Sequence, residues 1–370
     1  MPLFASSTPA LGELEARLRL HRVPHIGPAH FRTLVSAFGC ASAALSAPAA
    51  AWRALGMPPA AASARGDIAV REAATAALHW LGSPHHHLLA FDSPDYPALL
   101  GEIPNPPPLL FIAGEPGLLD RPQLAVVGSR RASAPGLDTA KAFSRALAGA
   151  GFVITSGLAT GIDGAAHRAA LDVNGATVAV LGSGLQRLYP QRHVRLAQAI
   201  VDQGGALVSE FPLQTAPTRE TFPQRNRIIS GLSLGVLVVE ANIASGSLIT
   251  ARLAAEQGRE VFAIPGSIHH PGMKGCHQLI RDGAQLVESV QHILEGLRGW
   301  QGPLPNEHTT ALASVPPDPL LQQLLAAPQT AQQLASSLCW PMPQVLAALT
   351  EHELAGRAVC EAGRWFGRPA

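Results

Sequence analysis

Apolar residues recur along this chain with two different spacings, and the change between them divides it into parts. In the N-terminal region Phe31, Leu34 and Val35 recur at the spacing of a helix face, and residues 12–80 as a whole are predicted to be helical. From residue 123 onward the apolar residues gather instead in short continuous runs. Short runs bounded by turns are typical of strands buried on both faces of a parallel sheet. The pattern therefore predicts a helical unit followed by an α/β unit.

Seven apolar runs are the candidate strands of the α/β unit, and helical stretches such as Leu137–Gly149 and Ile162–Asp172 separate them. The runs are residues 124–128, 152–155, 177–182, 206–210, 235–241, 260–266 and 285–289. Alternating strands and helices predict an extended Rossmann-like, doubly wound parallel sheet with helices on both faces. Ligands of such sheets bind at the carboxyl ends of the strands, so a site is expected in the loops that follow these runs.

The helical unit contains a turn, Ile26-Gly27-Pro28, between two predicted helices, and Gly39 suits the end of the second helix. This arrangement is typical of a SAM or helix-hairpin-helix unit, whose hairpin N–H groups can contact a phosphate. A purely structural helical bundle explains the pattern equally well, because few basic residues flank Gly27.

Residues 85–122 are rich in proline and cannot form a long helix. Short apolar pieces at Leu99–Leu100 and Leu109–Ile112 predict an extended arm that packs on the following domain. The histidines at 85–87 have no second group of metal ligands at a suitable spacing, so a surface turn is expected there rather than a metal site.

The C-terminal part is predicted to be a linker followed by a winged-helix-like unit. Residues 320–325, 330–338 and 342–352 are its helices, and a hairpin turns at Ala362-Gly363. Few basic residues lie on the third helix, so a role in protein interaction is at least as well supported as DNA reading. The predicted divisions of the chain are residues 1–84, 85–298, 299–318 for the linker and 319–370.

The composition of the chain excludes several classes of protein and of site. Hydrophobic residues make up 47% and charged residues 14% of the 370 residues, and much of the apolar fraction is alanine. No apolar run reaches the roughly 18 residues of a spanning helix, and the first residues lack the pattern of a secretory signal. The four cysteines are scattered, which argues against a disulfide framework or a zinc site and favours the cytoplasm. A formal net charge of +1 gives no global attraction to nucleic acid, so an anion site requires local clustering.

The loop after the first predicted strand, LAVVGSRR at Leu124–Arg131, has the features of an anion site. Gly128 permits a sharp turn, the following N–H groups can face an anion near a helix start, and Arg130 carries a planar cation suited to phosphate. An ordinary turn with a solvated arginine explains this stretch alone at least as well. However, glycine or small hydroxyl residues follow nearly every predicted strand, which predicts one crevice with many backbone donors.

The motifs of this α/β unit resemble those of the DNA-processing protein A family (DprA, also called Smf). The resemblance covers most of residues 90–295 in the right order. The matching stretches are VGSR at 127–130, SGLATGIDGAAHRAAL at 156–171, AVLGSGL with Tyr189-Pro190, VSEFP at 208–212, FPQRNRIISGLS at 222–233, SGSLITARLAAEQGREVFAIPG at 245–266 and GCHQLIRDGA at 275–284. One departure is His277, where the family usually has asparagine; we expect it to alter only local hydrogen bonding.

The resemblance implies a binding protein rather than an enzyme. Members of the family bind single-stranded DNA that enters during natural transformation, protect it, and load RecA recombinase onto it. They are usually dimers through the central domain. For this chain the resemblance implies no catalytic residue, cofactor or metal, no membrane association, and a homodimer.

Arginines gather near the predicted crevice in a chain that is otherwise poor in charge, which suits an electrostatic funnel for a single strand. Arg130 is the first candidate for a phosphate contact. The full set of predicted DNA- or phosphate-binding residues is Gly128, Ser129, Arg130, Ser156, Gly157, Gly182, Ser183, Gly184, Arg192, Arg225 and Arg227.

The acidic residues and the histidine near the predicted crevice, Asp163, Glu210, Glu240 and His167, are interpreted as structural supports rather than as an acid–base set. We expect His167 to pair with Asp163 one turn away on the same helix. Glu240 is expected to form an ion pair with the RNR segment at residues 225–227.

Two alternatives use the same Rossmann-like crevice. A nucleotide phosphoribohydrolase would carry a PGGxGTxxE signature, whereas this chain reads EANIASGSLITA at 240–251, without the paired glycines or the catalytic glutamate. The second alternative is a nucleotide-binding sensor whose C-terminal winged-helix-like unit signals to a partner. The length of nucleic acid that binds separates these hypotheses.

Overall fold

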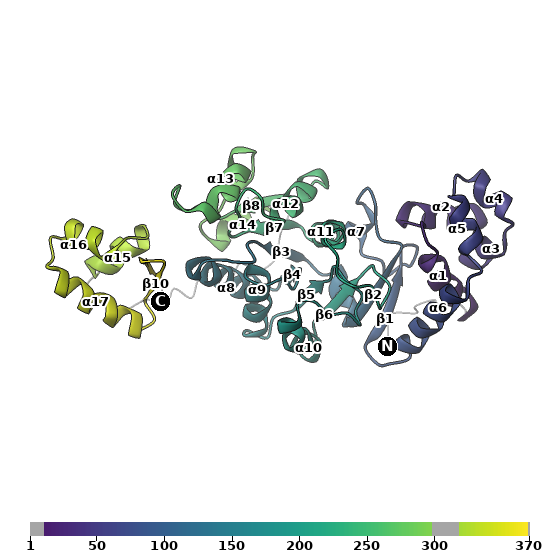
Figure 1. The fold of residues 1–370 in the computed structure, drawn as a ribbon, viewed down its shortest axis with the longest axis horizontal. Helices are drawn as coiled ribbons and strands as arrows, with labels where there is room; N and C mark the ends of the chain where they lie inside the picture. The colour runs from purple at the N-terminus through teal and green to yellow at the C-terminus, as the bar shows by residue number, and fades with distance from the viewer. Residues whose placement is uncertain (1–10, 298–317, 369–370) are drawn as a thin grey trace.

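The computed structural model describes residues 11–297 and 318–368, and its elements are drawn in Figure 1. The N-terminal unit is helical, as predicted, and its core is built around the fully buried side chains of Phe31, Leu34 and Trp52. Gly39 ends the second helix in the left-handed conformation, with φ 80°, a backbone region that glycine enters at little cost. The helices are α1 (Leu11–Arg22), α2 (Pro28–Phe38), α3 (Ala41–Ser46), α4 (Ala49–Ala54), α5 (Pro59–Ala64) and α6 (Ile68–Leu81).

The central unit contains a nine-stranded sheet in the order β1-β2-β6-β5-β4-β3-β7-β8-β9. The strands from β6 to β9 in this order are parallel, and the strand order reverses between β3 and β7. This confirms the predicted doubly wound sheet. The strands are β1 (His86–Ala90), β2 (Leu109–Gly114), β3 (Gln123–Val127), β4 (Val153–Ser156), β5 (Thr177–Val180), β6 (Ala206–Ser209), β7 (Gly235–Val238), β8 (Glu260–Ala263) and β9 (Gln285–Leu286).

The proline-rich arm does pack on the central domain, and it does so by adding the antiparallel strands β1 and β2 to the edge of the sheet. The predicted surface turn is confirmed for His85 and wrong for His86 and His87, because β1 begins at His86. The His86 ring stacks on Trp80 with a centroid distance of 3.9 Å, and strand pairing with β2 holds the backbone extended. Two short helices complete the arm, α7 (Ala98–Gly101) and the 3-10 helix η1 (Pro116–Asp120).

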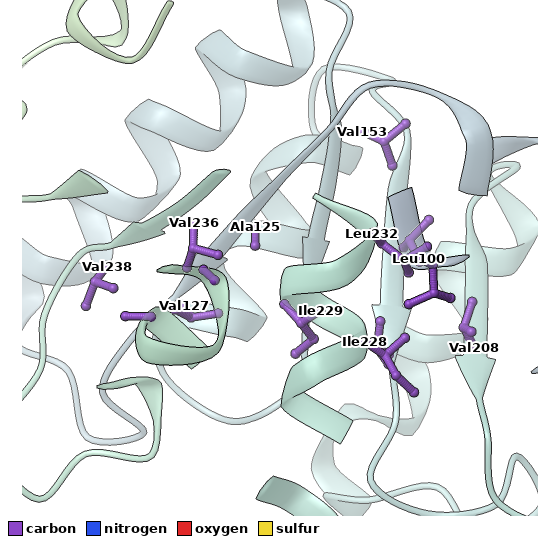
Figure 2. Close-up of a cluster of buried hydrophobic side chains, with 14 of the residues drawn as sticks. Leu100, Ala125, Val127, Val153, Val208, Ile228, Ile229, Leu232, Val236 and Val238 are labelled. Carbon is purple, nitrogen blue, oxygen red and sulfur yellow. The ribbon is translucent and has the colours of Figure 1, made fainter. Parts of the chain in front are cut away.

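Helices cover both faces of the sheet because successive residues of each strand point to opposite sides. In β3, Ala125 and Val127 belong to the hydrophobic cluster that includes Ile228 and Ile229 of α11, as Figure 2 shows. Leu124 and Val126 belong to the opposite cluster, with residues of α8 and α9. The helices of this unit are α8 (Ala134–Gly149), α9 (Ile162–Leu171), α10 (Val194–Asp202), α11 (Thr221–Leu232), α12 (Ser247–Glu256), α13 (Lys274–Arg281) and α14 (Val290–Gly296), with the 3-10 helices η2 (Gln191–His193) and η3 (Pro271–Met273).

The C-terminal unit has the predicted three helices and hairpin of a winged helix. Leu320, Leu334 and Leu349 lie in its core, and Ala362 and Gly363 turn the hairpin with positive φ. The elements are α15 (Pro319–Ala326), α16 (Ala331–Leu338), α17 (Met342–Leu354), β10 (Ala358–Glu361) and β11 (Arg364–Gly367). The predicted linker, apart from Asp318, lies outside the described residues. Within the described parts of the chain, no helix is both long and apolar enough to cross a bilayer.

Candidate nucleic-acid interface

Loops from the carboxyl ends of β3, β4 and β5 meet the start of α11 and form a pocket of about 340 Å³. Its walls include two arginines and two aromatic rings and contain no carboxylate. A positively charged pocket with aromatic walls matches the needs of a nucleic-acid strand, which presents phosphates and flat bases. The lining residues are Arg130, Gly157, Ala159, Thr160, Tyr189, Pro190, Gln191, Arg192 and Phe222.

Phe222, at the start of α11, lies at the centre of the contacts in this pocket. The guanidinium carbon of Arg130 lies 5.1 Å from the centroid of the Phe222 ring, within cation–π distance. The Tyr189 ring, 46% exposed, lies 5.7 Å from the Phe222 ring between centroids and is tilted by 52°. Tyr189 precedes Pro190 through a cis peptide bond. The sequence interpretation did not single out Phe222; the available signal was an aromatic residue beside the RNR arginines in a chain with 5% aromatic residues.

The loop after β3 is shaped by contacts across the sheet. A Cβ on Gly128 would lie 2.6 Å from the Ile162 side chain and 2.9 Å from the Glu240 carbonyl oxygen, so this position requires glycine. The Ser129 N–H donates to that same carbonyl at 2.6 Å, and is therefore already bonded within the protein. The Thr160 hydroxyl donates to the Arg130 carbonyl at 3.0 Å, which ties this loop to the next one. Arg130 itself is exposed. Of the three predicted residues in this loop, Arg130 is the one in the pocket lining.

The loop after β4 is organised by the buried carboxylate of Asp163. The N–H groups of Gly157 and Ala159 donate to Asp163 Oδ2 at 3.1 and 3.3 Å, and the Ser156 hydroxyl donates to the Val126 carbonyl at 2.6 Å. Burial raises the pKa of Asp163. The two amides that would have faced a phosphate therefore hold a carboxylate of the protein. Gly157 remains part of the pocket wall.

The predicted pairing of His167 with Asp163 is wrong. His167 is fully buried, and its Nδ1 lies 2.7 Å from the hydroxyl oxygen of Thr177. Because the Thr177 hydroxyl donates its own proton to the Ile154 carbonyl, His167 Nδ1 is the donor to Thr177. Burial lowers the pKa of His167 to about 3, so the ring is neutral at physiological pH.

The segment 182–184 lies beneath the pocket rather than on its surface. A Cβ on Gly182 would lie 2.7 Å from the Phe222 ring, and one on Gly184 would lie 2.2 Å from the carbonyl oxygens of residues 212 and 213. Ser183 is 2% exposed, and the Gly184 N–H donates to the Thr215 carbonyl at 2.9 Å. We expected these residues to offer N–H groups to a phosphate. Instead, Gly182 lies against the Phe222 ring and Gly184 against the backbone of residues 212–213, and close approach of the backbone requires glycine at both positions.

Arg225 of the RNR segment is enclosed by protein. It is 4% exposed, donates to the Val180 carbonyl, and packs so closely on Gly157 that a Cβ there would lie 2.0 Å from Arg225 Nη1. Burial lowers its pKa to about 10, and the nearby Asp163 opposes that shift. Its side chain therefore supports the loop after β4 from below.

Arg227 is also engaged within the protein. Its two terminal nitrogens donate to the two carboxylate oxygens of Glu210 at 2.5 and 2.6 Å, and its Nε donates to the Asn105 carbonyl at 3.0 Å. The expected partner of the RNR segment was Glu240, and this prediction is wrong. Glu240 instead accepts hydrogen bonds from the N–H and hydroxyl of Ser133, the latter at 2.7 Å. The strand order explains the difference, because β7 lies beside β3 while Glu210 follows β6.

Glu240 occupies the point where the strand order reverses. In doubly wound sheets a nucleotide phosphate commonly binds at the helix N-terminus beside this point. Here the carboxylate of Glu240 is 3% exposed and fills the first turn of α8, where even a Cβ on Gly136 would lie 2.4 Å from its Oε2. The pocket opens on one side of this point, over β3, β4 and β5.

Arg192 is exposed on η2, and the next residue anchors its segment. The His193 ring is 6% exposed, and its Nδ1 lies 2.8 Å from the Leu158 carbonyl oxygen in the loop after β4. This contact fixes the Arg192 segment against that loop. The structure thus brings Arg130, Gly157 and Arg192 together in one pocket lining. Among the residues that the structure describes, no group of three or more His, Cys, Asp or Glu side chains is placed to hold a metal ion.

His277 lies on α13, away from the residues that line the pocket. Its Nε2 is 3.0 Å from the Gly266 carbonyl oxygen, in the loop after β8. The side chain thus makes a local hydrogen bond to the backbone.

Comparison with protein-family models matches all three units of the chain. Residues 87–298, more than half of the chain, match the family described as DNA recombination-mediator protein A. Residues 12–77 match the DprA-like N-terminal HHH domain, and residues 305–364 match the DprA winged helix domain.

Individual relatives agree with these matches. Protein Smf of Escherichia coli is 48% identical over 293 residues, covering 77% of this chain and 78% of that protein. The DNA processing protein DprA of Streptococcus pneumoniae is 49% identical over 199 residues, covering 54% of this chain and 70% of that protein. The crystal structure of S. pneumoniae DprA aligns with a TM-score of 0.66 at 35% identity, covering 78% of this chain and 99% of that one. One further structure, of a DNA processing protein A from Helicobacter pylori, concerns the single-stranded DNA binding mode of that protein. It aligns with a TM-score of 0.51 at 30% identity, covering 56% of this chain and 93% of that one.

The fold, the order of the three units and the relatives lead to the same assignment. The chain belongs to the DNA recombination-mediator protein A family.

Proposed function

We propose that this chain binds single-stranded DNA in the pocket between Arg130, Arg192, Tyr189 and Phe222. The observation that carries the proposal is the position of the Arg130 guanidinium over the Phe222 ring at the mouth of a pocket without carboxylates. A cation beside an aromatic face suits one nucleotide unit, since the arginine meets the phosphate and the ring stacks on the base. The H. pylori relative is described as a single-stranded DNA-binding protein, which supports the same ligand here.

A strand fits this edge of the sheet better than a free nucleotide. The helix N-terminus at the reversal of strand order, where a nucleotide phosphate would bind, holds the buried carboxylate of Glu240. The open pocket lies over the neighbouring strands, where Arg130 and Arg192 are exposed to solvent. Phosphates of a flexible strand can approach from solvent and gain affinity by releasing counterions.

Each predicted site residue has a role in this proposal. Arg130 and Arg192 contact phosphates, and Tyr189 and Phe222 stack on bases. Gly128, Ser129, Ser156 and Gly157 shape the two loops, Gly182 lets Phe222 pack on the backbone, and Ser183 and Gly184 lie within the loop after β5. Arg225 acts as a positioning residue beneath the pocket, and Arg227 ties α11 to Glu210, because both arginines are hydrogen-bonded within the protein.

We further propose that the protein works in the cytoplasm as a homodimer, protects DNA that enters during natural transformation, and loads RecA recombinase onto it, without catalysing a reaction. The relatives named DNA processing protein support a role in DNA processing. RecA loading is tested by the rate at which RecA filaments form on single-stranded DNA with and without this protein. Sedimentation of the free chain tests the dimer.

The decisive experiment titrates the protein with oligonucleotides of increasing length and with nucleoside monophosphates, over a range of salt concentrations. We expect affinity to rise with length and to fall steeply with salt. Tight binding of a monophosphate would support the nucleotide sensor, and release of free base from it would support the phosphoribohydrolase. Equal affinity for duplex and single strand would contradict the proposed site.

A further inference from the structure

The N-terminus of α8 receives carboxylates from two different parts of the chain. Glu240, after β7, accepts from the N–H and hydroxyl of Ser133. Glu361, at the end of β10 in the winged-helix unit, accepts from the next backbone N–H, that of Ala134, at 2.9 Å. The first N–H groups of a helix have no partner within the helix, and the helix dipole favours an anion there. The winged-helix unit therefore places an anion at the N-terminus of a helix of the central unit.

A second polar contact joins the same two units. Arg368, just after β11, forms an ion pair with Asp138, one turn along α8, with 2.7 Å between Nε and Oδ2. Both contacts come from the hairpin, and Figure 1 shows β10 on the side of the winged-helix unit that faces α8. Beside them, a cavity of about 860 Å³ opens between the units, and the residues that line it include His269 and Gln333. A contact that rests on two polar pairs beside an open cavity is suited to opening and closing.

The strand order places this contact beside the proposed DNA pocket. Arg130 and Ala134 lie on the same connection from β3 to α8, and Arg130 lines the pocket. The neighbouring strands β7 and β8 continue the same edge, and the loop after β8 contributes His269 to the cavity. A DNA strand that extends from Arg130 in this direction meets the position that Glu361 occupies.

We propose that the hairpin of the winged-helix unit is an autoinhibitory latch: Glu361 and Arg368 hold this unit on α8, and the Glu361 carboxylate lies in the path of a DNA strand that extends beyond the pocket. A phosphate of such a strand and the Glu361 carboxylate repel each other, so the strand cannot follow this path while Glu361 is bonded to the Ala134 N–H. A short oligonucleotide fits in the pocket and leaves the latch closed. A longer strand displaces Glu361, and the winged-helix unit is released from α8. The latch rests on the proposed binding of single-stranded DNA beside Arg130.

The test compares the full chain with the double variant Glu361→Ala/Arg368→Ala. Both substitutions lie in the winged-helix unit, so the central unit keeps its sequence and Ser133 keeps its bond to Glu240. The matched control is Glu353→Ala, which removes an exposed carboxylate of the same unit from α17. Small-angle X-ray scattering measures the radius of gyration without DNA, and fluorescence anisotropy measures affinity for an oligonucleotide that fills the pocket and for one several times longer.

We expect the double variant to have a larger radius of gyration than the wild type and the control. Its affinity for the long oligonucleotide should rise about threefold to tenfold, the effect of losing two partly buried polar contacts, while its affinity for the short one stays the same. The wild type should expand when the long oligonucleotide binds. An unchanged radius in the double variant would overturn the latch, as would a larger radius with unchanged or weaker binding of the long oligonucleotide. If the wild type binds neither oligonucleotide, the proposed function fails, and the radius without DNA still reports whether the hairpin holds α8.

Discussion

The guanidinium carbon of Arg130 lies 5.1 Å from the ring centroid of Phe222, although the two residues are 92 positions apart in the chain. Arg130 comes from the loop after β3, and Phe222 begins α11 after β6. The parallel sheet brings the carboxyl ends of these strands to one edge, and this places a cation over an aromatic face. Neither residue alone defines a nucleic-acid site, and together they offer surfaces for a phosphate and a base.

Replacing Arg130 with alanine should weaken binding of single-stranded DNA and leave the thermal midpoint nearly unchanged, because the side chain is exposed. Loss of one phosphate contact should reduce the slope of log affinity against log salt by about 0.7. Fluorescence anisotropy at several salt concentrations measures both effects. Arg131→Ala is the control, since Arg131 is also exposed and is not part of the pocket lining. Equal losses in both variants would contradict a specific contact at Arg130.

Replacing Phe222 with leucine should lower affinity for single-stranded DNA by about 1–3 kcal/mol, the range for loss of one base-stacking ring. Leucine retains apolar packing over Gly182 but has no aromatic face. Phe222→Tyr is the matched variant and should bind nearly as well as the wild type. Equilibrium titration with one fluorescent oligonucleotide compares the three proteins. If leucine binds as tightly as phenylalanine, the ring is not a stacking surface.

Replacing Gly157 with alanine should destabilise the central unit by about 1–3 kcal/mol, as overpacking usually does. The added methyl group would lie 2.0 Å from Arg225 Nη1, and the buried Arg225 cannot move into solvent without losing its bond to Val180. Gly149→Ala at the end of α8 is the control, because nothing lies within 4 Å of its added methyl group. Urea denaturation measures both free energies of unfolding. A Gly157→Ala protein as stable as the wild type would show that Arg225 is not fixed there.

The buried histidine His167 should make the protein less stable in acid. Its pKa is lowered from 6.5 to about 3 in the folded state, so the unfolded chain binds more protons between these values. Its contribution to stability is therefore complete above pH 6.5 and decreases as the pH falls toward 3, by up to about 1.4 kcal/mol per pH unit. The free energy of unfolding of His167→Gln should depend less steeply on pH over this range. His269→Gln, at an exposed histidine, should follow the wild type; a wild-type slope in His167→Gln would refute this assignment.

The local pattern of apolar and polar residues was sufficient to predict most of the fold. The apolar runs that became β3 to β9 are short and continuous because these strands are mostly buried on both faces, and the alternating helices require a parallel sheet. The observed strands end a few residues earlier than several of the predicted ones, since the apolar residues after β7, such as Val239 and Ala241, stay buried after strand pairing ends. Local composition predicts a turn at His86 and carries no sign of β2, although pairing with β2 is what forms the strand there.

The sequence by itself determined the doubly wound sheet, the helical and winged-helix units, and Arg130 as the first candidate for a phosphate contact. It could not determine which polar groups remain available to a ligand. The tertiary structure decided that the Ser129 and Gly157 N–H groups are bonded within the protein, that Arg227 pairs with Glu210, and that Phe222 joins Arg130. The physical reason is that a buried donor or charge must find a partner, and the partner is set by strand order rather than by distance along the chain.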